Sequence, residues 1–309
     1  MSRIVLFCAT RRGYLFLKKL IEISPDSEIY VFSFREEPWE PSFFDDIRGL
    51  ITANGGQFFE TKQLDSDKIV SLWEHTPIDI MLVVSWRYMI PATIYSMSRS
   101  GTYVFHDSLL PKHRGFSPTV WAICNGEKYT GVTLFKIAEE VDAGDIVDQI
   151  TVPIGPEDTI ADVMDQLTQA YLDLLVKNIN GLANGSIKLR PQDHSRATYT
   201  CKRLPADNKI NWSLSCESIY NLIRAVSLPY PGAYTYFSGR KLQVWIAERV
   251  ANIHKYVGKI PGRICEVRPG EGSLVLAGDG ALLLKKVQLE DGEIICASDL
   301  LNSLSHTLG

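Results

Sequence analysis

The sequence lacks the features of a membrane-embedded, disulfide-linked or metal-binding protein. No apolar run approaches the roughly 20 residues that span a bilayer, and residues 1–8 lead directly into a strand-like segment without a signal-peptide pattern. The six cysteines are scattered, with no Cys-x-x-Cys pair and no clustered histidine. Neither a disulfide framework nor a metal site is therefore predicted, and a cytoplasmic protein with reduced thiols is expected.

An excess of basic charge is also missing. The chain has 309 residues, with 32 Lys and Arg against 36 Asp and Glu, which gives a formal net charge of −4. Proteins that neutralise a phosphate backbone usually carry a positive charge. Nucleic acid is therefore a less favoured partner, although a local basic patch would still permit it. Internal repeats and low-complexity tracts are absent as well.

Short apolar runs alternate with amphipathic helical patterns over the first half of the chain. Near-continuous apolar strands of this kind are typical of a parallel sheet that is covered on both faces. We therefore predict an α/β domain with a doubly wound, mostly parallel sheet, whose ligands lie at the carboxyl ends of the strands. The expected strands are residues 3–8, 28–34, 78–84, 102–105, 129–136 and 145–152, and a long helix is expected over residues 159–178.

The composition changes after the long helix. Residues 181–204 are polar and contain Gly185, Pro191 and Asp193, as a linker would. After a short helix at 218–226, strand-like segments are separated by turn signals such as Gly278-Asp279-Gly280, which predicts a small β-barrel-like domain. The expected organisation is an α/β domain over residues 1–180, a linker over 181–204 and a C-terminal domain over 205–309.

A histidine and an aspartate are placed where they could act together. His106 follows the expected strand that ends at Phe105, and Asp142 lies one strand further on, in Val141-Asp142-Ala143-Gly144-Asp145. A base and an orienting carboxylate on rigid neighbouring elements are the minimum needed to move a proton during acyl transfer. A lone histidine is more often structural, but its position beside a Gly-flanked loop and this acidic segment favours catalysis as a hypothesis.

The motif around His106 resembles the signature of the folate-dependent formyltransferases, Asn-x-His-x-Ser-Leu-Leu-Pro-x-x-x-Gly. Segments 202–212 and 229–233 are similar to the C-terminal domain of methionyl-tRNA formyltransferase and of enzymes that formylate nucleotide-linked amino sugars. The likeness is greatest to the module that modifies UDP-linked 4-amino-4-deoxy-L-arabinose. It implies a Rossmann-like catalytic domain, an OB-like second domain and N10-formyltetrahydrofolate as co-substrate.

The resemblance also implies roles for individual residues. His106 would accept the proton of the attacking amine, and Asp142 would hold the imidazole ring. Val104 stands where the family has the Asn that stabilises the oxyanion. Losing such a donor costs about 2.7–4 kcal/mol of a catalytic contribution of at least about 8 kcal/mol, which permits a slower enzyme. Protonated His106, a backbone N–H or a water could replace it, or the register could be shifted so that Tyr103 faces the site.

Two groups of ligand-contacting residues follow from the same resemblance. Large apolar residues are usually packing, so this expectation rests on the family motif and not on residue type. The expected co-substrate residues are Trp86, Arg87, Tyr88, Met89, Ile137, Val141 and Asp142. The expected acceptor residues are Ser108, Leu109, Lys112, Arg114, Lys202 and Arg203.

The segment after the second strand bears on the identity of the amine. Relatives that act on tRNA carry a basic insertion there, whereas residues 35–46 of this chain are acidic and aromatic, which would repel RNA. The predicted acceptor is therefore a nucleotide-linked amino sugar, with methionyl-tRNA as the second hypothesis. A formyltetrahydrofolate hydrolase and a catalytically silent folate- or nucleotide-binding protein remain as alternatives, and the oligomeric state is left open.

Overall fold

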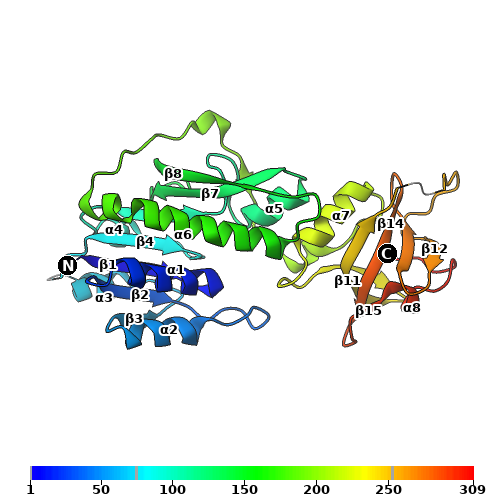
Figure 1. Ribbon diagram of the computed structural model, residues 1–309, viewed down its shortest axis with the longest axis horizontal. Coiled ribbons are helices and arrows are strands. Elements are labelled where there is room, and N and C mark those ends of the chain that lie inside the picture. The colour runs from blue at the N-terminus through cyan, green and yellow to red at the C-terminus, as the bar shows by residue number, and fades with distance from the viewer. Residues whose placement is uncertain (1, 74–75, 252–253) are drawn as a thin grey trace. The chain divides into compact units, whose positions relative to one another are not determined.

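The computed structural model describes residues 2–73, 76–251 and 254–309, and it divides into two compact units (Figure 1). The first unit comprises Met1–Pro118, Thr130–Pro153 and Asp165–Cys201, and the second comprises Thr119–Tyr129, Ile154–Met164 and Lys202–Gly309. Each unit is thus assembled from segments that are distant in the sequence. The expected domain boundaries stay a prediction, but residues 181–201, which we expected to be a linker, belong to the first unit.

The first unit contains the predicted doubly wound sheet, and this fold class is confirmed. Its seven strands have the order β3-β2-β1-β4-β5-β7-β8. The pairs from β3 to β5 are parallel, and β7 runs antiparallel to β5. The strands are β1 (Arg3–Cys8), β2 (Glu28–Ser33), β3 (Gln57–Glu60), β4 (Ile80–Val84), β5 (Thr102–His106), β7 (Tyr129–Lys136) and β8 (Ile146–Pro153).

Helices cover both faces of this sheet because both faces of its central strands are apolar. On one face, Phe105 of β5 packs against Phe16 of α1 (Thr10–Ile23) and Tyr171 of α6 (Ile160–Asn184), with ring centroids 4.9 and 5.5 Å away. Figure 1 shows α1 and α6 in front of the sheet. On the other face, α3 (Ser66–Trp73) and α4 (Ala92–Tyr95) contribute Trp73 and Ile94 to the core. The remaining helix of the sheet region is α2 (Phe44–Ala53).

The start of α6 is fixed by its own side chains. The Asp162 carboxylate accepts hydrogen bonds from the Thr159 backbone N–H at 2.9 Å and the Thr159 hydroxyl at 2.6 Å, which is a capping interaction. The helix therefore begins where the Thr159–Asp162 spacing predicts, and it extends beyond the expected end to Asn184. By contrast, β3 gave no clear sequence signal, because it is a four-residue edge strand with both ends exposed.

The second unit is built on an antiparallel sheet of order β10-β11-β14-β13-β12, to which β15 adds by pairing with β14. The separate β domain is therefore confirmed. Its strands are β10 (Ala233–Phe237), β11 (Arg240–Arg249), β12 (Ile264–Arg268), β13 (Gly272–Leu276), β14 (Ala281–Leu289) and β15 (Ile295–Cys296). Its helices are α5 (Pro118–Cys124), α7 (Cys216–Ala225) and α8 (Ala297–Leu300), with the short turns η1 (His194–Arg196) in the first unit and η2 (Pro205–Asn208) in the second.

The first unit also contains a separate two-stranded sheet. The two-residue strands β6 (Arg114–Gly115) and β9 (Tyr199–Thr200) pair in parallel within the first unit. Among the residues described, every helix is too short or too polar to cross a bilayer.

Candidate active site

The structure brings His106 and Asp142 together at the carboxyl end of β5. The His106 Nδ1 atom lies 3.7 Å from Asp142 Oδ2, and the side chains are 10% and 15% exposed. On the other side of the ring, Nε2 lies 3.0 Å from the backbone oxygen of His113. A carbonyl can only accept a hydrogen bond, so Nε2 carries a proton in this arrangement. The imidazole is therefore held between a carboxylate and a carbonyl.

The position of Asp142 is fixed by its backbone. Asp142 has φ 53°, in the left-handed region that Asp adopts more readily than most residues, and its Oδ2 accepts a hydrogen bond from the Gly115 N–H at 2.8 Å. Two residues later, a Cβ at Gly144 would lie 1.7 Å from the Lys136 oxygen, so no other residue fits there. The Asp-Ala-Gly sequence is therefore required by the backbone conformation at Asp142 and the close packing at Gly144, in addition to the chemistry expected of Asp142.

The loop after His106 is held by its own hydrogen bonds. The Ser108 hydroxyl donates to the Lys112 oxygen at 2.7 Å, and the Ser108 oxygen accepts from the Thr133 hydroxyl at 2.6 Å. Ser108 is 1% exposed, so its hydroxyl shapes the turn. Leu109 packs against the backbone, since a Cβ at Gly131 would lie 2.5 Å from Leu109 Cδ2. Of the predicted acceptor residues in this loop, Lys112 has an exposed side chain.

Arg114, predicted as a cation for the acceptor, is fully buried. Its Nη2 donates to Gln192 Oε1 at 2.8 Å and lies 3.1 Å from His194 Nδ1. Its Nη1 donates to the Tyr199 hydroxyl at 3.1 Å, and that hydroxyl donates in turn to Glu140 at 2.9 Å. In this structure the guanidinium thus anchors the loop. Its partners lie about eighty residues away in the sequence, so the motif alone could not indicate them.

Val104 lies on the same face of β5 as His106 and packs against the apolar cluster of Leu110, Phe135 and Ile146. The register is direct, with Val83 opposite on β4 and Phe135 opposite on β7. Tyr103 points to the other face, where its hydroxyl donates to the Ser100 oxygen at 2.8 Å. The alternative in which Tyr103 takes the place of the family Asn is therefore wrong.

The loop after β4 is tied down by aromatic contacts and by one ion pair. Trp86 packs edge-on against Phe7 and Phe34, with centroids 5.3 and 5.4 Å away. Arg87 makes a bidentate pair with Glu40, at 2.8 and 2.5 Å. Burial by itself would raise the pKa of Glu40, but Arg87 outweighs it, so the pKa lies below its usual range. This pair joins the loop to the acidic segment 35–46.

The other predicted co-substrate residues differ in exposure. Tyr88 packs edge-on against Phe34 at 5.0 Å. Ile137 is partly buried against the core, and its N–H donates to the Thr102 oxygen at 2.9 Å. Met89 is 70% exposed and Val141 is 44% exposed. The latter two side chains are thus free of the core and available to a ligand.

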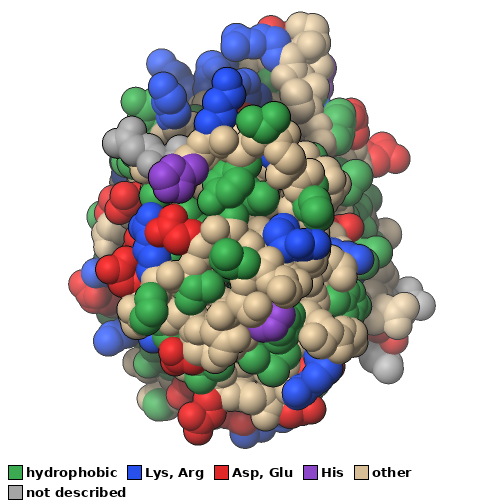
Figure 2. Space-filling view, turned by 90° about the vertical axis from the view of Figure 1, so that its right-hand side faces the viewer, with side chains coloured by type: hydrophobic (Ala, Val, Ile, Leu, Met, Phe, Trp, Pro, Cys, Tyr) green, Lys and Arg blue, Asp and Glu red, His purple; other side chains and the backbone are tan. Residues whose placement is uncertain are grey.

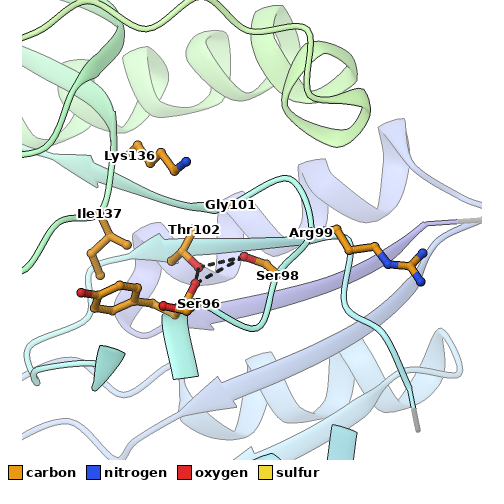
Figure 3. Close-up of a pocket in the computed structure, with 8 residues that line it drawn as sticks. Ser96, Ser98, Arg99, Gly101, Thr102, Lys136 and Ile137 are labelled. Atoms are coloured by element: carbon orange, nitrogen blue, oxygen red, sulfur yellow. Dashed lines mark hydrogen bonds between the residues drawn. The ribbon is translucent and has the colours of Figure 1, made fainter. Parts of the chain in front are cut away.

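A pocket of about 270 Å³ lies at the amino-terminal end of β5 (Figure 3). The Thr102 hydroxyl donates to the Tyr95 oxygen at 2.7 Å and lies 3.2 Å from the Ser98 hydroxyl, while Figure 3 shows Arg99 pointing away from both. Thr102 and His106 are the two ends of β5 and lie about 13 Å apart at the usual rise. The pocket is lined by Tyr95, Ser96, Ser98, Arg99, Gly101, Thr102, Lys136 and Ile137.

The ion pair between Arg12 and Asp107, the residue after His106, could not be recognised from the sequence. Arg12 Nη1 lies 2.7 and 2.8 Å from the two carboxylate oxygens of Asp107, and Tyr171 donates a hydrogen bond to the same carboxylate. The side chains of Arg12 and Asp107 are 8% and 21% exposed. Burial alone would raise the pKa of Asp107, but the charge and hydrogen bonds of Arg12 and Tyr171 outweigh it and lower the pKa.

Replacing Asp107 with asparagine is expected to lower the free energy of unfolding by about 3–5 kcal/mol at neutral pH, because Arg12 then stays buried opposite a neutral amide. The folded-state pKa of Asp107 lies below the unfolded value of about 3.9, so the wild type holds this advantage above about pH 4 and loses it as the pH falls through the lowered pKa. Urea unfolding at a series of pH values measures the difference.

Asp165→Asn is the matched control for this prediction. Asp165 pairs with Arg11 at 2.5 Å, but both side chains are more than half exposed, so its loss should change stability by less than about 1 kcal/mol. A difference between the wild type and the Asp107→Asn variant that stays constant as the pH falls to about 3 would contradict the lowered pKa of Asp107.

The two remaining predicted acceptor residues lie in the second unit. Lys202 is exposed. Arg203 lies over the ring of Trp121 at 4.9 Å and donates to the Asp207 oxygen at 2.8 Å and to Asn208 Oδ1 at 2.9 Å. Arg203 therefore stabilises η2 in addition to any contact with a ligand.

Two family models match this sequence. One, described as formyl transferase, matches residues 22–179, and the other, described as formyl transferase, C-terminal domain, matches residues 204–305. The first covers about half of the chain, and the two matches do not overlap.

Solved structures resemble this fold over nearly the whole chain. HypX from Aquifex aeolicus in complex with tetrahydrofolic acid has a TM-score of 0.64 at 18% identity, over 97% of this chain and 46% of HypX, so the chain spans about half of that protein. WlaRD, a sugar 3N-formyl transferase studied with dTDP and 5-N-formyl-THF, has a TM-score of 0.66 at 20% identity, over 95% of this chain and 99% of WlaRD.

A third structure matches over comparable lengths of both chains. The N-formyltransferase from Helicobacter canadensis in complex with folinic acid and dTDP-3-aminofucose has a TM-score of 0.65 at 19% identity, over 96% of this chain and all of that one. At such identities the likeness establishes a shared fold.

Proposed function

Because this chain belongs to the formyl transferase family, we propose that it transfers a formyl group from N10-formyltetrahydrofolate to the primary amine of a nucleotide-linked amino sugar. The observation that carries the proposal is the approach of His106 to Asp142, with 3.7 Å between Nδ1 and Oδ2 at the carboxyl end of β5. Similar structures that were solved with tetrahydrofolate or a formyl folate, and with dTDP or dTDP-3-aminofucose, support both substrate classes.

His106 acts as the base in this proposal. The amine nitrogen forms a bond to the formyl carbon and releases a proton, and the carbon's bond to the folate nitrogen breaks, so that this nitrogen takes up a proton. For the ring to accept the amine proton at Nε2, the amine must replace the His113 oxygen that now occupies this atom. The ring must also change tautomer, with its proton on Nδ1, facing the Asp142 carboxylate, and no longer on Nε2. The Nε2 lone pair is then free, and the carboxylate stabilises the ring that gains the amine proton.

The residues predicted to contact the co-substrate fit a flat heteroaromatic ring. The loop after β4 presents the partly buried Trp86 and the exposed Met89, and the segment before Asp142 presents the exposed Val141, whereas Ile137 lies beside Thr102 at the other end of β5. N10-formyltetrahydrofolate would supply the formyl group. The side chains of Trp86, Met89 and Val141 would bind and orient it through apolar contact.

Charge favours the amino-sugar acceptor over tRNA. Segment 35–46 keeps its acidic character, although Glu40 is paired with Arg87 and Glu36 accepts from the Phe43 N–H at 3.0 Å. Figure 2 views the molecule from the side that carries the strands of the second unit, where basic side chains gather at the upper margin and acidic ones lie at the left and below. A mixed face of this kind is less suited to a phosphate backbone than a continuous basic one. Lys112 of the first unit is an exposed cation for a diphosphate.

A turnover assay with formyltetrahydrofolate tests the proposal. Release of tetrahydrofolate is followed with no acceptor, with a panel of nucleotide-linked amino sugars and with methionyl-tRNA. Release that depends on one of the sugars supports the proposal. Release without an acceptor would indicate a hydrolase, release with tRNA the alternative transferase, and no release with any acceptor a silent binding protein.

Val104→Asn is expected to raise kcat, by up to about 10²-fold, because it restores a donor to the developing oxyanion. The same change should lower the free energy of unfolding by about 1–3 kcal/mol, since Val104 packs against Leu110, Phe135 and Ile146. Steady-state kinetics and urea unfolding measure the two effects. Val104→Leu, which adds no donor, is the control, and a lower rate for Val104→Asn would mean that this site stabilises charge by other groups.

A further inference from the structure

Residues 190–200 run alongside both loops that hold the His106–Asp142 pair. Arg190 forms an antiparallel bridge with Ile146, and β9 pairs with β6. Between these contacts, the Thr198 hydroxyl accepts from the His113 N–H at 2.9 Å. A segment that composition marked as a linker is therefore built into the first unit at its site.

Gln192 is the most fully engaged side chain of this segment. It is 5% exposed. Its Oε1 accepts from Arg114 Nη2 at 2.8 Å and Nε at 3.3 Å, and its Nε2 donates to the Asp142 oxygen at 2.8 Å and the Gly144 oxygen at 2.7 Å. A primary amide has two acceptor and two donor positions, so all four are used. Such a side chain has one orientation and fixes its partners accordingly.

The partners of Gln192 are the backbones that hold the His–Asp pair. Arg114 lies between His113, whose oxygen accepts from His106, and Gly115, whose N–H donates to Asp142. The other partners are the carbonyls of Asp142 itself and of Gly144. One amide thus joins the two loops whose separation sets the distance between imidazole and carboxylate.

We propose that Gln192 is a positioning residue for the reaction, which places the Asp142 carboxylate relative to His106. The inference rests on the proposed function for its kinetic consequences and on geometry alone for its structural ones. The amide is required and a carboxylate would not serve, because the Asp142 and Gly144 oxygens need N–H donors, whereas Arg114 needs only an acceptor. Gln192→Glu therefore distinguishes the two sets of contacts. The variant keeps an acceptor for Arg114 but places negative charge against the backbone oxygens of Asp142 and Gly144.

The test compares Gln192→Glu with Gln192→Met, which is apolar and of similar size. Both variants should lower kcat by about 10²-fold, as displacement of a catalytic group by about 1 Å does, with KM for either substrate little changed. Asn178→Ala is the control: Asn178 is a buried amide in the same unit that donates to Asp148 at 3.1 Å and the Leu174 oxygen at 2.9 Å, away from the pair. It should retain the wild-type kcat.

A second readout does not depend on turnover. The imidazole NMR signals of His106, assigned by their loss in His106→Ala, should move at fixed pH in both Gln192 variants and stay in place in Asn178→Ala. This outcome would support the inference even if the chain transferred no formyl group. A wild-type kcat and unmoved His106 signals in Gln192→Glu would overturn it. If neither variant folds, Gln192→Asn, with the amide one methylene shorter, carries the same two readouts.

Discussion

Replacing His106 with alanine is expected to lower kcat by about 10²–10⁴-fold, since the amine would lose the group that accepts its proton. The fold should tolerate the change, because the polar contacts of the ring are the His113 oxygen and the Asp142 carboxylate, and neither holds a strand in place. Steady-state kinetics with saturating formyltetrahydrofolate and acceptor, together with thermal unfolding, measure the two quantities.

His306→Ala is the matched control for this variant. His306 lies in the second unit, where its ring packs edge-on against Phe237 at 4.9 Å. Its replacement therefore removes an imidazole from the unit that does not contain β5. Wild-type turnover is expected for it. A near-normal rate for His106→Ala would place the proton path elsewhere, and the proposed mechanism would then be wrong.

Asp142→Asn is expected to lower kcat by a similar factor of about 10²–10⁴, although it changes almost no volume. The amide oxygen can still accept from the Gly115 N–H, so the loop should keep its shape. The charge that stabilises protonated His106 is lost, because the oxygen that accepts from Gly115 also faces Nδ1 and would then belong to a neutral amide. KM should change less than kcat, because the loss falls mainly on the transition state.

Asp165→Asn serves as the charge-matched control for Asp142→Asn. It also removes one carboxylate from the first unit, but Asp165 is an exposed residue of α6 that pairs with Arg11 of α1. Equal losses in the two variants would point to a general effect of net charge. A loss confined to Asp142→Asn, with unfolding temperatures alike, would be the expected result.

The strands themselves could be predicted, because their apolar runs are read directly from the sequence. Their geometry does not bring His106 and Asp142 together: β5 and β7 are antiparallel, with Lys136 opposite Tyr103, so the chain must return through residues 137–142 to reach His106. The register of Val104 opposite Val83 could not be predicted, because near-continuous apolar strands carry no alternation that would fix it. The family motif then supplied the chemistry that periodicity could not.

The partners of the site residues could not be predicted in this way. Arg114 reads as a basic residue in a turn, yet it is fully buried because Gln192 and Tyr199 bring acceptors from far along the chain. Arg12 and Asp107 are similarly 95 residues apart. Such pairings depend on how the helices and strands pack against one another. For the same reason, the polar composition of residues 181–204 predicted a linker, although residues 181–201 belong to the first unit.

The interleaving of the two units sets a limit on how this protein can be dissected. A fragment that ends at residue 180 would retain Arg114 but discard Gln192, His194 and Tyr199, so its guanidinium would lose three partners and keep the Glu140 carboxylate, 3.5 Å from Nη1. Residues 119–129 and 154–164 would likewise be severed from the remainder of the unit to which they belong. A single cut therefore cannot separate the chain into the two units.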